Sequence, residues 1–173
     1  MNGDGTRRPV AQISLLFGKG RRPDIGALRA LADAHGDFSV CHEHFVEGLA
    51  AGAELLVNGL TFDLSDLAPT DGAGVPECAH RFDVPCNVPE QEVEAISLVP
   101  GPHLSGGAAM MPIVRSMLEL AVSLSRLDGL LALVWQPAQS WIGPRYFASM
   151  TRNWLEGGVF PARGLVGLGA VPD

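Results

Sequence analysis

The sequence predicts one α+β domain: a mixed sheet built from two β-α-β units with helices mainly on one face, in a ferredoxin-like or related arrangement. Two observations lead to this class. Short apolar runs that end at glycine or proline alternate with segments in which apolar residues recur at helical spacing. The 173 residues are 47% hydrophobic and 18% charged, a composition typical of a folded domain rather than a disordered chain.

The first β-α-β unit is expected near the N-terminus. The apolar run at 11–17 predicts a buried strand. Apolar residues at helical spacing after Pro23 predict a helix that carries this proline in its first turn, where its missing N–H has no intrahelical partner. Gly36 is expected to end the helix, and residues 38–41 are expected to form the next strand.

A β-hairpin is the favoured interpretation of residues 54–67. Asn58 and Gly59 lie between two short apolar runs, and both residues tolerate the positive φ that a type I′ turn requires. The alternative is a single bulged strand with Gly59 at the bulge.

Two segments show no periodicity. Residues 1–9 are expected to be a disordered leader, so the single domain is expected to span 10–173. Residues 68–91 form a Pro/Gly-rich loop insertion that contains Pro69, Pro76, Pro85 and Pro89. A loop of this length inside a compact domain is usually functional or mobile.

The second β-α-β unit follows this insertion. Residues 94–99 predict a strand, and a glycine-rich turn at 100–107 leads into the strongest helical pattern of the chain. That helix is expected to carry Pro112 in its first turn and to stop at Gly129. The continuous apolar run 130–135 predicts a central strand that is covered on both faces.

The C-terminal part is expected to add one helix and one strand. A helix is predicted from Pro144 to the pair Gly157-Gly158, with apolar residues along one face. Residues 159–168 are expected to form a last, glycine-weakened strand.

The charge balance argues against some partners. The formal net charge of −7 repels phosphate backbones and anionic lipid, so neither nucleic acid nor membrane is an expected partner. No apolar run approaches the roughly 20 residues of a membrane helix. No export signal precedes the domain, so a cytoplasmic location is expected, with Cys41, Cys78 and Cys86 as reduced thiols.

A group of cysteines and histidines provides a candidate zinc site. His42 and His44 lie on one side of a predicted strand, and Cys78 and His80 could be brought to them by the 68–91 loop. Cys86 and His103 are further candidate ligands. The paired spacing of structural zinc sites is missing, so the alternative is a strand end with exposed histidines and a loop with incidental thiols. In that case no cofactor is expected.

The turn at 100–107 is a candidate anion site. Backbone N–H groups at a helix N-terminus bind anions, and Gly106 and Gly107 would let the backbone approach the ligand. His103 and Ser105 could add side-chain contacts. Neither phosphate-loop motif is present, so the alternative is a rigid connection between strand and helix.

Aromatic residues mark a third candidate site. Trp135 and Trp141 flank a short polar turn, where they could form a ligand or partner surface. Phe147 and Trp154 on the next helix are assigned to the core. Trp141 is expected to be exposed because it lies among polar and turn residues.

Residues 94–154 resemble a bacterial family known only as domain of unknown function 4261. The resemblance rests on an apolar strand, a long helix, a strand that ends at Trp135, Ser140, and the aromatic pair Tyr146 and Phe147 at the start of the next helix. It implies a compact bacterial α+β domain with no assigned activity, so it provides no catalytic residues.

The leading hypothesis for function is a non-catalytic binding or protein-interaction domain, acting as a homodimer or with a protein partner. No G-x-S-x-G nucleophile elbow is present, and Cys41 and its neighbour His42 point to opposite faces of a strand. The first alternative is a metal-dependent enzyme that uses the Cys/His group. The second is small-anion binding at the 100–107 turn.

Overall fold

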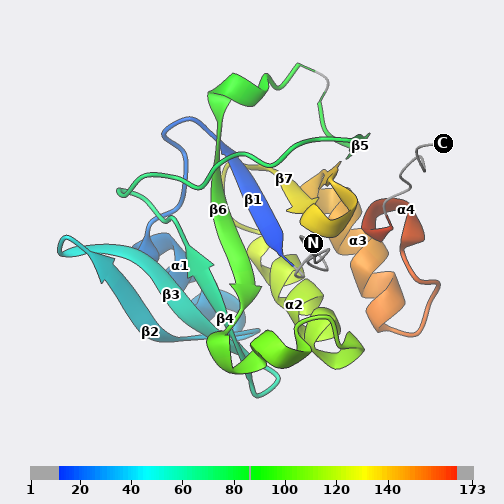
Figure 1. Ribbon diagram of the computed structural model, residues 1–173, viewed down its shortest axis with the longest axis horizontal. Helices are drawn as coiled ribbons and strands as arrows, with labels where there is room; N and C mark the ends of the chain where they lie inside the picture. Colours follow the sequence, from blue (N-terminus) through cyan, green and yellow to red (C-terminus); the bar gives the residue numbers. More distant parts are fainter. Residues whose placement is uncertain (1–11, 86, 167–173) are drawn as a thin grey trace, which may run out of the picture.

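The computed structural model describes residues 12–166 except residue 86, and it has an α+β fold with an eight-stranded mixed open sheet (Figure 1). The strand order is β2-β3-β4-β6-β1-β7-β8-β5. All neighbouring strands are antiparallel except β5 and β8, which are parallel. The strands are β1 (Ile13–Gly18), β2 (Ser39–Val46), β3 (Leu49–Val57), β4 (Leu60–Ser65), β5 (His80–Phe82), β6 (Val93–Pro100), β7 (Leu130–Trp135) and β8 (Ser140–Ile142). The helices are α1 (Ile25–His35), α2 (Met111–Leu124), α3 (Pro144–Leu155) and α4 (Ala162–Leu165).

The predicted fold class is confirmed at the level of an α+β domain with a mixed sheet. Residues of α1, α2, α3 and α4 all join one large apolar cluster against one face of the sheet. The predicted units β1-α1-β2 and β6-α2-β7 are present, but neither joins adjacent strands. β1 lies between β6 and β7, and three strands separate β1 from β2. The ferredoxin-like assignment stays a prediction.

Helix α1 begins at Ile25, two residues after Pro23. Asp24 is the N-cap, and its carboxylate accepts a hydrogen bond from the backbone N–H of Ala27 at 2.8 Å. Pro23 therefore precedes the cap and is outside the first turn. Gly36 ends the helix with φ +68°, as predicted.

Two tight turns shape the edge of the sheet. Asn58 and Gly59 have φ values of +52° and +75° between the paired strands β3 and β4, so the predicted type I′ hairpin is confirmed. Glu47 and Gly48 form a second turn with positive φ, between β2 and β3. The predicted strand 38–41 is therefore the start of the longer strand β2, and the chain returns along β3 after this turn.

The described residues of the 68–91 segment cover the face of the sheet that the helices leave open. Ala73 forms a bridge to Ala95 of β6, and β5 adds the segment to the far edge of the sheet. Val84 joins a second apolar cluster on this face, together with buried residues of β1, β6, β7 and β8. This segment is therefore a structural layer over the sheet, and the described part of it contains a strand that the sequence pattern does not predict.

The C-terminal expectation is partly wrong. Helix α3 is confirmed, and Gly157 follows it with φ +97°. The expected strand at 159–168 is wrong for its described part, which contains the short helix α4 instead. The helix predicted up to Gly129 ends at Leu124, where α2 gives way to turns that reach the positive φ of Gly129.

Gly143 holds the β5 edge and α3 together at close range. A Cβ at this position would lie 2.1 Å from the carbonyl oxygen of Asp83, so Gly143→Ala forces the backbone apart. We expect the free energy of unfolding to fall by about 2 kcal/mol in urea denaturation. Gly74→Ala is the control, because nothing lies within 4 Å of its added methyl group. Equal losses in the two variants would contradict the close-approach argument.

Candidate functional site

Strand β2 is an open edge of the sheet. It is eight residues long and pairs with β3 on one side only, and six of its eight side chains are exposed. The opposite edge, β5, has three residues and is much shorter. An edge strand presents unpaired N–H and C=O groups, which are a template for pairing with another chain. β2 is therefore the larger of the two surfaces at which this sheet can be extended.

Apolar side chains gather where β2 turns into β3. Phe45, Val46 and Leu49 are exposed to 62%, 56% and 46% of their surface, and they surround the Glu47-Gly48 turn. Isolated exposed apolar residues are ordinary, but here three lie at the tip of one hairpin, with Val46 paired to Leu49 across the turn. We call these three residues the hairpin tip. Beside it, a groove of about 590 Å³ is lined by carboxylates that include Asp63 and Asp71.

The candidate zinc ligands are divided between the two edges of the sheet. His42 and His44 lie on β2, whereas Cys78 precedes β5 and His80 lies on it. His44 faces Asp63 at 3.7 Å, and the Cys78 thiol donates to the backbone carbonyl of its neighbour His80. The described residues contain no group of three or more side chains suited to a metal ion. Cys86 lies outside the described residues, and Cys41 and Cys78 are free thiols.

The predicted anion turn does not lie at the start of an α-helix. Residues 102–107 form a 3₁₀ helix, and α2 begins only at Met111. His103 and Ser105 are exposed, as is Gly106, and Gly107 is half-buried beside Met110. The His103 ring lies 3.3 Å from the hydroxyl of Thr61, so it packs on the neighbouring strand β4. The free backbone N–H groups at the start of α2, which were expected to bind the anion, therefore lie after the 100–107 turn and not within it.

The expectation that Trp141 is exposed is wrong. Its side chain is completely buried in the second apolar cluster, and its Nε1–H donates to the carbonyl of Pro76 at 3.3 Å. Trp135 is also buried, in the main cluster on the helical face. Both tryptophans are core residues, and Phe147 is core as predicted.

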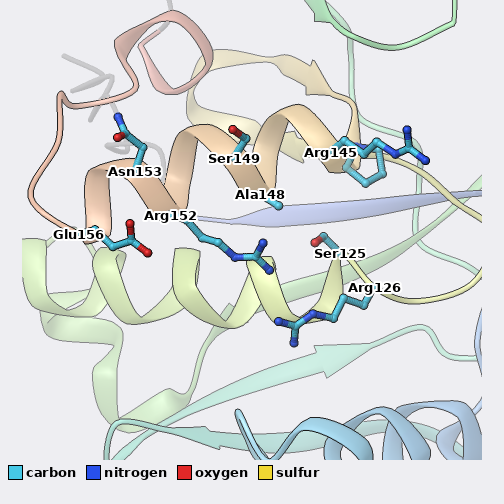
Figure 2. Close-up of a pocket in the computed structure, with 9 residues that line it drawn as sticks. Ser125, Arg126, Arg145, Ala148, Ser149, Arg152, Asn153 and Glu156 are labelled. Atoms are coloured by element: carbon cyan, nitrogen blue, oxygen red, sulfur yellow. The ribbon is translucent and has the colours of Figure 1, made fainter.

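A basic groove that the sequence analysis did not identify lies between the end of α2 and the exposed side of α3. It has a volume of about 650 Å³, and Arg126, Arg145 and Arg152 line it (Figure 2). Arg145 and Arg152 are seven residues apart on α3, a spacing that places them on one helix face. That spacing was the available signal, but the contribution of Arg126 depends on how α2 and α3 pack.

No protein-family model, curated protein or solved structure matches this chain. The resemblance of residues 94–154 to a family of unknown function therefore stays a prediction. None of the helices among the described residues has the length and apolarity to cross a membrane.

Proposed function

We propose that this protein is a non-catalytic interaction domain that pairs with a second copy of itself through strand β2. The single observation that carries the proposal is the exposed eight-residue edge strand with an apolar hairpin tip at its end. Antiparallel pairing of two identical edges is self-complementary, because each copy offers the other the same row of backbone donors and acceptors.

The sequence of β2 favours a second copy over an unrelated partner. Glu43 lies at the centre of a nearly symmetric pattern. A histidine stands on each side of it, followed by Cys41 in one direction and Phe45 in the other, and then by a valine in both directions. Antiparallel pairing centred on Glu43 sets Val46 of one copy opposite Val40 of the other. It also sets Phe45 opposite Cys41, so that apolar groups meet at both ends and the imidazoles lie together in the middle.

The centre of this pairing would place two carboxylates opposite each other, and each copy supplies its own counter-charge. Arg29 of α1 forms an ion pair with Glu43. This pair reduces the repulsion that two bare glutamates would exert across the interface.

Register shifts on the β2–β3 ladder limit how much the backbone can contribute. One shift lies between Val40 and His42, and another lies between His44 and Phe45. Because such irregularities shorten a regular edge, few backbone hydrogen bonds can form with a second copy. The hairpin tip must therefore provide much of the affinity through apolar burial.

The test is self-association measured by sedimentation equilibrium. We expect a concentration-dependent dimer, and we expect Phe45→Lys to raise its dissociation constant by at least about tenfold, because the change puts a charge in the apolar contact. Val159→Lys makes a similar apolar-to-lysine change at a residue that is 82% exposed and lies away from β2, so it is expected to leave the constant unchanged.

Two results would contradict the proposal. If the wild-type protein stays monomeric at several hundred micromolar, a second copy does not bind at this edge. A dimer that responds equally to both lysine variants would place the interface elsewhere. Circular dichroism of Phe45→Lys checks that the fold is retained, as expected for a change at a side chain already in solvent.

Two further expectations belong to this proposal. We also propose a cytoplasmic location, which the free thiols of Cys41 and Cys78 support, because thiols stay reduced there. A ferredoxin-like relationship is supported by the β6-α2-β7 unit, whose two parallel strands flank β1.

A further inference from the structure

We infer that the basic groove between α2 and α3 binds the phosphate group of a small, polar phosphomonoester. This inference is independent of pairing through β2. It rests on the arginines that line the groove, on the unused hydrogen-bonding capacity of two of them, and on the change of charge along the groove.

The groove is large enough for a small ligand and follows the helix pair. Its first part, about 650 Å³, lies between the end of α2 and the side of α3. A second part of about 440 Å³ continues from it and shares Arg126, Arg152 and Glu156 with the first. Figure 2 shows Arg152 reaching from α3 toward the end of α2, where Ser125 and Arg126 lie. Ligand sites commonly have volumes of roughly 300–1,000 Å³.

Two of the three guanidinium groups are available to a ligand. Arg126 forms an ion pair with Asp37, and this contact lowers the pKa of that carboxyl. Arg145 and Arg152 have no ion pair or side-chain hydrogen bond within the described part of the chain. A guanidinium carries five N–H donors in a planar fork that matches phosphate oxygens. Unpaired arginines in a concave site of an acidic protein are therefore suited to a dianion.

The start of α3 adds to the positive potential at one end. Pro144 and Arg145 of the first turn line the groove, and this end of a helix carries a partial positive charge from its free N–H groups. Ser149 and Asn153 add neutral polar groups along the same helix. The phosphate is therefore placed along the arginine-bearing side of α3.

The second part of the groove carries more carboxylates than the first. Asp37 and Glu119 line this part alone, Glu156 lines both parts, and their carboxylates accept hydrogen bonds. No aromatic side chain is among the residues lining either part, so the described walls offer no stacking platform for a base. A hydroxylated body, such as that of a sugar phosphate, matches these acceptors better than a nucleoside does.

The experiment is isothermal titration of the full chain with ribose 5-phosphate and, separately, with inorganic phosphate, both at constant ionic strength. We expect the ester to bind more tightly than inorganic phosphate, because its hydroxyl groups reach the carboxylates. Arg152→Gln is expected to weaken ester binding by about tenfold, since it removes one charge-assisted contact. Arg21→Gln removes the same charge from an exposed loop residue outside the groove, and it is expected to change binding less than about twofold.

Four outcomes would overturn the inference. The first is the absence of any heat of binding with either probe at ten millimolar. The second is equal weakening by the two glutamine variants, and the third is unchanged binding in Arg152→Gln. The fourth is inorganic phosphate that binds as tightly as the ester. Equal weakening would indicate a general charge effect. Inorganic phosphate that binds as tightly as the ester would show that the groove does not recognise the organic part of the ligand. The double variant Arg145→Gln, Arg152→Gln checks a weak single effect and is expected to abolish binding. Sedimentation of the same variants is expected to be unchanged, which separates this test from that of β2 pairing.

Discussion

Replacing Trp141 by alanine is expected to lower the free energy of unfolding by about 3–5 kcal/mol, the range for deleting a fully buried large aromatic side chain. Trp141 belongs to β8, and its completely buried side chain shares an apolar cluster with residues of the 68–91 segment. Its ring contacts the apolar cluster of the second sheet face, the guanidinium of Arg81 lies 4.8 Å from its centre, and its N–H donates to Pro76. The deletion leaves a cavity and an unpaired carbonyl at the same place. Urea denaturation at neutral pH measures the loss.

This variant also tests whether the 68–91 segment is a layer of the fold. We expect the amides of Ala73 and Ala79, which bond to Ala95 and Gln139, to exchange faster with solvent. Trp141→Phe is the matched control, because it keeps most of the apolar volume and loses the N–H bond, and it is expected to cost about 1–2 kcal/mol. A loss below about 1 kcal/mol in Trp141→Ala, with unchanged amide protection, would mean that Trp141 does not hold this segment.

Arg22→Met is expected to cost about 3 kcal/mol, because it breaks a largely buried ionic contact and leaves its partners without a donor. The Arg22 side chain is 8% exposed, and its Nε donates to the Glu94 carboxylate at 2.9 Å. Its other nitrogens donate to the backbone carbonyls of Asp66 and Thr70. One arginine thus ties the loop before α1 to β6 and to the start of the 68–91 segment. Arg126→Met, which breaks the more exposed pair with Asp37, is the control and is expected to cost less than about 1 kcal/mol.

The effect of Arg22→Met is expected to depend on pH. The Arg22 hydrogen bond holds the pKa of Glu94 below its ordinary value of 4.5. Since the folded pKa is lowered, the stabilisation is present above the unfolded pKa and is lost as the pH falls through the folded pKa. The stability difference between wild type and Arg22→Met should therefore be constant near neutral pH and narrow below about pH 4.5. A difference that widens in acid would contradict this role of Glu94.

Local chemistry predicted several elements correctly because the responsible residues are close in sequence. The type I′ turn follows from Asn58 and Gly59 alone, and the end of α1 follows from Gly36. The predicted start of α1 is wrong because Asp24, next to Pro23, is the residue that caps the helix. The strands β5 and β8 have three residues each, too few to show an alternating pattern. They exist because β8 pairs with β7 on one side and with β5 on the other.

The candidate sites divide in the same way. The sequence identified exposed histidines on an extended strand, but only the strand order places β2 at one edge and Cys78 and His80 at the other. The polar surroundings of Trp141 in the sequence indicated exposure. Its burial depends on Pro76 and its neighbours, 65 positions away along the chain, folding back over the sheet.

By itself, the sequence determined the α+β class, the main helices, the glycine that ends α1, the hairpin turn and the absence of nucleophile and phosphate-loop motifs, because each of these depends on neighbouring residues and their periodicity. Only the tertiary structure decided which strand is an open edge, which face the 68–91 segment covers, and that Arg126 and Arg152 line the same groove. These features depend on contacts between distant segments. Burial of apolar surface stabilises such contacts, and the area that is buried depends on the whole assembled fold rather than on a local sequence pattern.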